Sequence, residues 1–377
     1  MFGILFYLSL LFFTCAFLFL FRKKIVTVSN GLISNTYAEF FLFIFSISPI
    51  ILSYGLRYGI GTDYFAYEKI YYVLKNADFN KYLLLHKESF GEYYVEFGYY
   101  VLNKLSYNYT LLLFLTGLLI YTFLFHGTKK LLESNNLALP FFIYFCTQFI
   151  YSMNGVRFSI AITIIFYGYN YIYKKKIIKW CIVVFIATLF HKTAIICLPF
   201  YFLGDFKSKK RNKTRDILYY AFIFLFPLFI TLLFKIIVYI PLFSRYFQTE
   251  RYALGSFLFK PKFLAHIIPV ILPLLFVKPS SIFKDKKALF FFRIFLFQIP
   301  LRELGSLNKW LTRLVRFPQM VEIVFIPYIL SKIKNKKLRL FLMYYYFLLY
   351  VFFFIYYAFV NDSGDSLSYQ SIIFYPN

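Results

Sequence analysis

Long apolar stretches, each about as long as a bilayer is thick, alternate along the chain with short polar segments. A helix needs about 20 residues to cross a hydrocarbon core of about 30 Å. The first apolar stretch has no small-residue cleavage site and continues directly into Arg22, so we expect a retained anchor and not a removed signal peptide. The pattern predicts about ten membrane-spanning helices, at residues 2–21, 38–55, 109–125, 137–153, 157–173, 217–240, 263–278, 288–301, 311–330 and 340–360.

The composition agrees with this pattern. Of 377 residues, 61% are hydrophobic and only 15% are charged, whereas soluble domains have about 25% charged residues. The chain cannot cover its apolar side chains with a polar surface of its own, so the predicted fold class is an all-α polytopic membrane protein with one integral membrane domain, 1–377. The net charge of +26 would suggest nucleic acid on a soluble chain. Here we expect basic loops at a lipid surface and no nucleic-acid partner. The four cysteines lie in apolar runs without metal-ligand spacing.

The basic residues predict the orientation of the spans. More than half of the 42 Lys and Arg residues lie in six segments that contain few acidic residues. These segments are cytoplasmic by the positive-inside rule. Both termini are then expected outside, together with the loop region 55–108, in which acidic and basic residues are equal in number. The six cytoplasmic segments are 22–37, 126–136, 174–179, 204–216, 278–287 and 331–339.

Residues 180–203 break the alternation of spans and loops. They are long enough for one span, but basic segments lie on both sides, and a single crossing would place one of these segments outside. We therefore predict a re-entrant hairpin of two short helices whose tip, His191, Lys192 and Thr193, points toward the outer side. Non-helical backbone at this depth is tolerated only inside the protein or beside a water-filled cavity, so we expect His191 to line a cavity.

Arginines gather at the outer ends of the predicted spans. The planar guanidinium binds phosphate or carboxylate through two oxygens at a time, so a group of them at this boundary suits a lipid with an anionic head group. A single arginine is explained equally well by snorkelling to the interface. Inside the span 288–301, we expect Arg293 to pair with Glu322. The outer arginines are Arg57, Arg157, Arg245, Arg251, Arg313 and Arg316.

The motif RYGIGTDYFAY, residues 57–67, begins where the second predicted span ends. Its glycines permit a tight bend and a close approach of a ligand to the backbone. Asp63 then follows just beyond the bilayer edge and is a candidate general base for a sugar hydroxyl. Alternatively, it pairs with Arg57 or caps the helix that follows. Tyr64 and Tyr67 either stack on sugar rings or belong to the aromatic belt of the membrane interface.

Two further segments carry candidate chemistry. The segment VEFGYYVLNKL, 95–105, has apolar residues at helical spacing and predicts an interfacial helix on the outer face. Glu96 at its start is either the cap of this helix or a ligand for a sugar hydroxyl. His191 is a second candidate base, because imidazole accepts a proton near neutral pH. Alternatively, it is a helix-breaking residue satisfied by backbone carbonyls.

Four motifs in order resemble the EpsG family of bacterial exopolysaccharide polymerases, which is grouped with the Wzy O-antigen polymerases. After residue 205 the resemblance is reduced to Arg245 with Tyr246 and to Arg313. Leu314, Val315 and Arg316 follow Arg313 where the family pattern has an aromatic pair, so either Arg313 or Arg316 is the equivalent arginine. The four motifs are RYGIGTDYFAY at 57–67, EFGYYVLN at 96–103, NGVRFSIAI at 154–162 and LFHKTAIICLPFY at 189–201.

This resemblance implies a fold akin to the GT-C glycosyltransferases and a multi-pass protein of the bacterial inner membrane. It implies an O-antigen or capsule polymerase that moves a growing glycan from undecaprenyl pyrophosphate to the non-reducing end of a lipid-linked repeat unit. Asp63 is then the first choice for the base and His191 the second. The pyrophosphate develops negative charge as it leaves, which preorganised arginines stabilise. Partners would be the lipid-linked oligosaccharide, the bilayer and a chain-length regulator.

Further site residues follow from the same hypothesis. Arg157, Arg245 and either Arg313 or Arg316 would bind the donor pyrophosphate, with Arg251 as a further candidate, and Arg57 would join them or orient Asp63. Because the outer segments contain no DxD or similar acidic cluster, we expect no metal and no cofactor.

Proteins of other classes would share part of this pattern. An O-antigen ligase also binds undecaprenyl pyrophosphate and is the closest alternative, and a membrane acyltransferase would use a similar outer site. A lipid-linked oligosaccharide flippase or other transporter is expected to show internal repeats and charges at mid-membrane depth. The sequence has no evident repeat between its halves, and its intramembrane charges are few.

Overall fold

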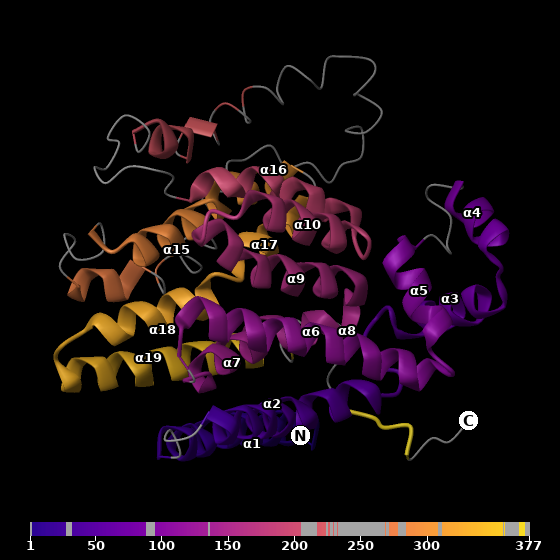
Figure 1. Ribbon diagram of the computed structural model, residues 1–377, viewed down its shortest axis with the longest axis horizontal. Helices are drawn as coiled ribbons and strands as arrows, with labels where there is room; N and C mark the ends of the chain where they lie inside the picture. Colours follow the sequence, from indigo (N-terminus) through magenta and orange to yellow (C-terminus); the bar gives the residue numbers. More distant parts are fainter. Residues whose placement is uncertain are drawn as a thin grey trace. The chain divides into compact units, whose positions relative to one another are not determined.

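The computed structural model (Figure 1) is helical throughout the part that it describes, apart from one isolated β-bridge between Arg57 and Ser371. The chain packs as two compact units. The first contains Met1–Asn170, Ile178–Ile195 and Tyr344–Asn377, and the second contains Tyr171–Ile177 and Ile196–Met343. The described residues are 2–27, 32–87, 95–134, 136–204, 217–223, 225–226, 229, 232, 268, 271–277, 284–307, 311–356, 358 and 369–373.

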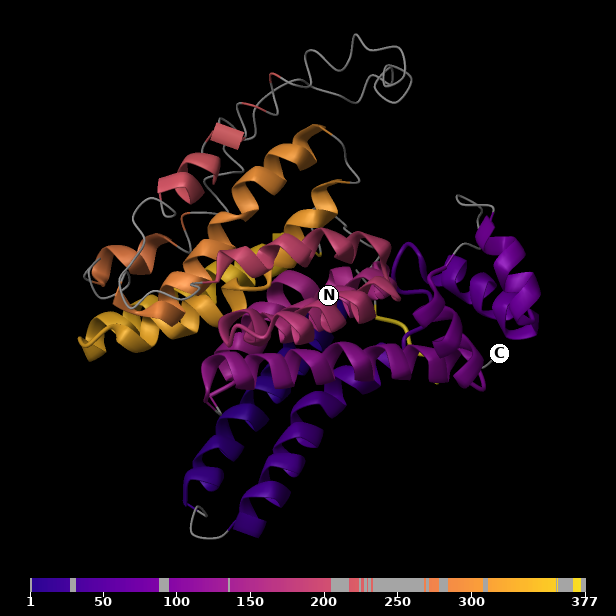
Figure 2. The same cartoon turned by 45° about the horizontal axis from the view of Figure 1, so that its top comes forward.

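The first unit begins with two long apolar helices, α1 (Phe2–Thr27) and α2 (Leu32–Gly55). They run side by side, as Figure 2 shows, and α2 also packs along α6 (Tyr109–Leu132). A Cβ atom on Gly55 would overlap the ring of Phe114, so glycine at this position allows α2 and α6 to approach each other closely. The helices α1, α2 and α6 thus bury part of their apolar surface against one another.

The rest of the first unit contains shorter helices. The loop region 55–108 forms three of them, including the helix expected within 95–105, and the predicted span 137–153 forms a rod interrupted by a π-helix. The three loop helices are α3 (Tyr64–Asn76), α4 (Phe79–Lys87) and α5 (Phe97–Leu105). The rod consists of α7 (Ala138–Tyr144), η1 (Phe145–Phe149) and α8 (Ile150–Asn154), and α9 (Val156–Tyr173) follows it.

The predicted break inside 180–203 is confirmed. Helix α10 (Ile177–Thr188) ends just before the expected tip, and the 3₁₀ helix η2 (Lys192–Leu203) begins within it. His191 lies in the turn that joins them. That this hairpin re-enters the membrane from one side stays a prediction.

The second unit holds the remaining helices. Asp285 caps α15 by accepting hydrogen bonds from the amides of Lys287 (2.9 Å) and Ala288 (3.1 Å), and its carboxylate also binds Tyr328 Oη (2.8 Å) and Lys332 Nζ (2.7 Å). The helices are η4 (Leu272–Phe276), α15 (Lys286–Leu296), α16 (Gln298–Leu307), η5 (Leu311–Val315), α17 (Arg316–Gln319), α18 (Glu322–Lys332) and α19 (Lys336–Ile355), the last of which continues into the first unit.

The expected ion pair between Arg293 and Glu322 is wrong. The Glu322 carboxylate accepts a hydrogen bond from Gln298 Nε2 at 3.0 Å, and Gln298 Oε1 accepts one from Arg302 at 3.1 Å. Glu322 forms no ion pair with Arg293 in the part of the chain that the structure describes. The cation connected to the Glu322 carboxylate is therefore Arg302, through the neutral side-chain amide of Gln298.

Among the residues that the structure describes, three helical segments are long and apolar enough to cross a membrane, Tyr109–Leu132, Thr312–Lys332 and Lys336–Ile355. Large apolar side chains of α19, such as Phe341 and Phe352, are exposed, as expected of a helix that faces lipid. The molecule is thus a helical membrane protein. The number of ten spans and the outward termini stay predictions, and about half of each of the predicted spans 217–240 and 263–278 falls outside the described residues.

Candidate functional site

Arg57 holds the end of α8. Its side chain is fully buried, and Nη1 donates a hydrogen bond to the carbonyl of Met153 at 2.8 Å. Tyr54 Oη donates to the adjacent carbonyl of Ser152 at 2.6 Å. The last carbonyls of a helix have no partner within the helix, and a cation is favourable at this negative end. Arg57 and Tyr54 therefore cap α8 directly before the NGVRF motif.

The Arg57 guanidinium has further donors. Its Cζ lies 4.4 Å from the centroid of the Tyr54 ring, a cation–π contact. Among the described residues, neither Nε nor Nη2 has a hydrogen-bond partner. A buried donor without a partner costs free energy, so the aromatic contact and the helix end offset only part of the cost of burying this cation.

The loop after Arg57 is docked on the same helix end. Gly61 has a φ of +103°, and a Cβ atom there would lie 2.7 Å from Asn154 Oδ1. Thr62 Oγ1 donates to the same Oδ1 at 3.3 Å. The loop therefore needs glycine at position 61, both for its backbone conformation and for this close approach. The first and third motifs are thus in direct contact.

Asp63 is exposed at the start of α3. Its side chain accepts no capping hydrogen bond from the helix, and it forms no ion pair with Arg57 or with another residue that the structure describes. Neither of the two structural alternatives, a pair with Arg57 or a helix cap, is therefore formed. The carboxylate is available to solvent or to a ligand.

Tyr64 and Tyr67 are buried. The Tyr64 ring packs edge-on against Tyr109 at 5.3 Å. The Tyr67 ring packs against Tyr99 at 5.7 Å and lies 5.8 Å from Cζ of Arg157. The Tyr64 ring lies near the Arg57 guanidinium and the Tyr67 ring near that of Arg157. Stacking of either ring on a sugar stays a prediction.

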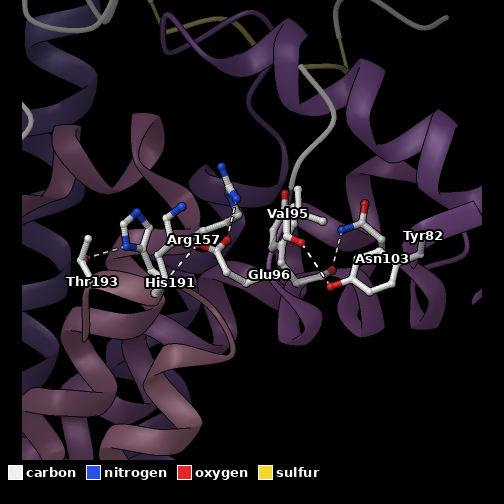
Figure 3. A network of polar contacts seen from close by, with 9 residues as sticks. Tyr82, Val95, Glu96, Asn103, Arg157, His191 and Thr193 are labelled. Atoms are coloured by element: carbon white, nitrogen blue, oxygen red, sulfur yellow. Dashed lines mark hydrogen bonds and ion pairs between the residues drawn. The ribbon is translucent and has the colours of Figure 1, made fainter. Parts of the chain in front are cut away.

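Glu96 joins α5 to two other parts of the first unit. Its Oε2 pairs with Nη1 of Arg157 at 2.6 Å, and its Oε1 accepts a hydrogen bond from the amide of Lys192 at 3.2 Å. Figure 3 shows the Glu96 side chain pointing toward Arg157, with His191 and Thr193 beyond it on the same side. The side-chain exposures are 7% for Glu96 and 20% for Arg157, so the pair is largely removed from solvent. Glu96 occupies the N-cap position of α5, but its side chain makes no capping hydrogen bond. Of the two alternatives considered for Glu96, the side-chain cap is therefore not formed, and the role as a ligand for a sugar hydroxyl stays a prediction.

The hairpin turn is locked against α5 and α9. The amide of Gly98 donates to the carbonyl of Leu189 at 2.6 Å, and a Cβ atom on Gly98 would lie 2.7 Å from that oxygen. His191 Nδ1 lies 2.7 Å from Thr193 Oγ1, and the imidazole packs edge-on against Phe158 at 4.8 Å. The partner of Nδ1 is therefore the Thr193 hydroxyl.

The structure brings together residues from all four motifs. Arg57, Glu96, Arg157 and His191 belong to one connected set of contacts in the first unit, with Asp63 exposed on the loop that starts it. Sequence reasoning missed Gly98, although its place two residues after Glu96 in the same motif was a usable signal. Such a site can bind an anion through Arg157 and accept a proton at Asp63 or His191.

The other predicted arginines belong to the second unit or fall outside the described residues. Arg313 and Arg316 belong to the second unit, in η5 and α17, where Arg313 is exposed and Arg316 is half-buried. Arg245 and Arg251 lie outside the described residues. A convergence of these arginines with Arg157 stays a prediction. The described part of the chain contains no group of three His, Cys, Asp or Glu side chains that could hold a metal ion.

The fold and the site together define a class, a helical membrane protein with an arginine-containing polar site next to an exposed carboxylate. The model of the EpsG family matches residues 40–374. The chain therefore belongs to the EpsG family, a family of Wzy-like polysaccharide polymerases. No individual curated protein and no solved structure matches it. Membership implies a membrane-bound polymerase of polysaccharide biosynthesis that acts on a lipid-linked oligosaccharide.

Proposed function

We propose that the protein is an O-antigen or capsule polymerase of the bacterial inner membrane. It transfers the growing glycan from undecaprenyl pyrophosphate to the non-reducing end of a lipid-linked repeat unit at the outer face. The observation that carries this proposal is the contact of all four motifs in the first unit around Arg157, Glu96 and the His191 turn.

The proposed reaction breaks the bond between the donor anomeric carbon and the pyrophosphate oxygen. A bond forms between that carbon and an acceptor hydroxyl, whose proton goes to a base. Negative charge develops on the pyrophosphate as it leaves, and a guanidinium that is already oriented stabilises this charge without reorganisation. Arg157 suits this task, because Glu96 and the Tyr67 ring fix its guanidinium while a fifth of its side chain stays exposed.

Asp63 is the proposed base. It is exposed and has no ion pair or hydrogen bond from its side chain to any residue that the structure describes. It precedes Tyr67 by four residues, and the Tyr67 amide donates to the Asp63 carbonyl at 2.9 Å. Asp63 is the N-cap residue of α3 and precedes by one turn Tyr67, whose ring lies 5.8 Å from Cζ of Arg157. His191 is the second candidate, because its imidazole belongs to the same set of contacts.

The test is complementation of a deletion strain with Asp63→Asn and His191→Ala, followed by gel analysis of polysaccharide chain length. Asp78→Asn is the matched control, since Asp78 caps α4 through the amide of Lys81 at 2.7 Å and Asn caps equally well. We expect long chains with the control and single repeats with Asp63→Asn. If Asp63→Asn and His191→Ala both keep long chains, the base assignment is wrong. A deletion strain that attaches no repeat at all to the lipid A core would indicate a ligase or a flippase.

A further inference from the structure

Residues 369–373, here called the return segment, lie against the end of α2. The amide of Tyr58 donates to the carbonyl of Gln370 at 2.9 Å, and the amide of Ile372 donates to the carbonyl of Leu56 at 3.0 Å. These two hydrogen bonds form the antiparallel bridge between Arg57 and Ser371. The return segment therefore pairs with the main chain on both sides of Arg57.

Tyr369 anchors the return segment a second time. Its hydroxyl donates to the carbonyl of Ser53 at 2.7 Å, which is one of the last carbonyls of α2. Its ring stacks on Phe6 of α1 with 3.9 Å between centroids and packs edge-on against Tyr7 at 6.2 Å. A contact across more than 300 positions of sequence thus fixes the return segment to both of the first two helices.

The bridge determines where the first motif starts. Leu56 and Tyr58 are each bound to the return segment by one main-chain hydrogen bond. The Arg57 side chain between them reaches the end of α8. The chain continues from this point through Gly61 to Asp63. The backbone that carries the proposed base therefore starts from a position fixed by the return segment.

We propose that the return segment is a positioning element of the active site. It touches no substrate, but it fixes the main chain at Arg57 and thereby the placement of Asp63 relative to Arg157. This inference rests on the proposed polymerase function. It adds that turnover depends on residues 369–373, far along the chain from the four motifs.

The pair Ile372→Pro and Ile372→Ala tests this role. Proline removes the amide hydrogen that Leu56 accepts and also restricts the backbone at positions 371 and 372, whereas alanine keeps the amide. The comparison therefore reports on the main-chain pairing of the return segment with Leu56. The assay measures kcat and KM for a lipid-linked repeat unit with the purified full-length protein. We expect kcat of the proline variant to be about tenfold below that of the alanine variant, the upper range for one hydrogen bond, with KM within about twofold. A general loss of folded protein would lower the active fraction, which a melting curve on the same samples detects.

The possible outcomes separate the two proposals. If the wild type polymerises and the two Ile372 variants have equal kcat, the positioning role is wrong and the polymerase function stands. If the wild type forms no polymer from lipid-linked repeats, both proposals fall. Where the proline variant does not reach the membrane, Tyr369→Phe decides. It removes only the hydroxyl that binds Ser53, so a lowered kcat supports the positioning role, and wild-type kcat overturns it.

Discussion

Replacing Glu96 by Gln tests the ion pair at the centre of the candidate site. The Glu96 carboxylate binds Arg157 Nη1 at 2.6 Å with one oxygen and accepts the amide of Lys192 at 3.2 Å with the other. Gln keeps the length of the side chain and an oxygen acceptor. The substitution therefore removes the charge and leaves most of the packing unchanged.

The expected magnitude follows from the burial of the pair. Exposed ion pairs contribute about 0–1 kcal/mol, whereas removing one partner of a buried pair costs about 3–5 kcal/mol. Glu96 is almost fully buried and Arg157 is one-fifth exposed, and Gln still offers a neutral hydrogen bond. We therefore expect Glu96→Gln to lower the free energy of unfolding by about 1–2 kcal/mol and Glu96→Ala by about 3 kcal/mol.

The assay is thermal unfolding of the purified variants in detergent, with a double-mutant cycle that adds Arg157→Gln. Glu68→Gln is the control, because Glu68 is a half-buried carboxylate of α3 without an ion pair or hydrogen bond among the described residues. Burial raises the pKa of Glu68, so its charge is unfavourable in the folded state. Loss of that charge is expected to be neutral or slightly stabilising.

Two results would refute this reasoning. One is a coupling energy near zero in the cycle of Glu96 and Arg157, which would mean that the two charges do not stabilise each other. The other is an equal loss of stability in Glu68→Gln, which would mean that any lost carboxylate in this region is destabilising. A coupling of about 1–2 kcal/mol is expected for a pair of this burial.

Two further predictions concern other contacts. Gly98→Ala would place a Cβ atom 2.7 Å from the carbonyl oxygen of Leu189. We expect a destabilisation of about 1–3 kcal/mol in thermal unfolding, since backbone and not a flexible side chain must move, and an unchanged melting temperature would contradict the close contact. In the second unit, burial alone would raise the pKa of Asp285, but hydrogen bonds, led by that of Lys332, outweigh it and hold the pKa below its ordinary value of 3.8. Its contribution to stability is present above that ordinary pKa and is lost as the pH falls through the lowered pKa. Asp285→Asn should therefore lose less stability than the wild type on acidification through this range, and melting curves with equal pH dependence would refute this.

The sequence predicted some of the helices closely, because apolar length and helix geometry determine them, whereas the predicted spans 288–301 and 311–330 are each divided into shorter helices. The predicted span 109–125 corresponds to α6, which continues to Leu132. The apolar pattern ends earlier than the helix because Lys129 and Lys130 in the last turn are favourable at a helix C-terminus but are not apolar. The π-helix η1 inside the span 137–153 was not predicted, since an extra residue in a helical turn leaves no trace in composition.

The pairing of charges was harder to predict. Arg293 and Glu322 were matched by sign and approximate depth alone. In the structure, Gln298 lies within hydrogen-bond distance of Glu322 and connects it to Arg302. Neutral polar residues compete for buried carboxylates, and only the tertiary packing decides which of them is closest. The pair of Glu96 and Arg157 was missed for the same reason, although both residues had been singled out individually.

Arg57 and Arg157 differ in how far their side chains are buried, and this difference bears on their roles. A ligand can reach Arg157, because a fifth of its side chain is exposed. Arg57 has no exposed surface and uses Nη1 on Met153, so a phosphate could touch it only after the loop or the return segment had moved. The burial of Arg57 therefore favours the role of orienting Asp63 over the role of binding the pyrophosphate. We propose that Arg57 orients the loop that carries Asp63, and we expect the donor pyrophosphate to contact Arg157 instead.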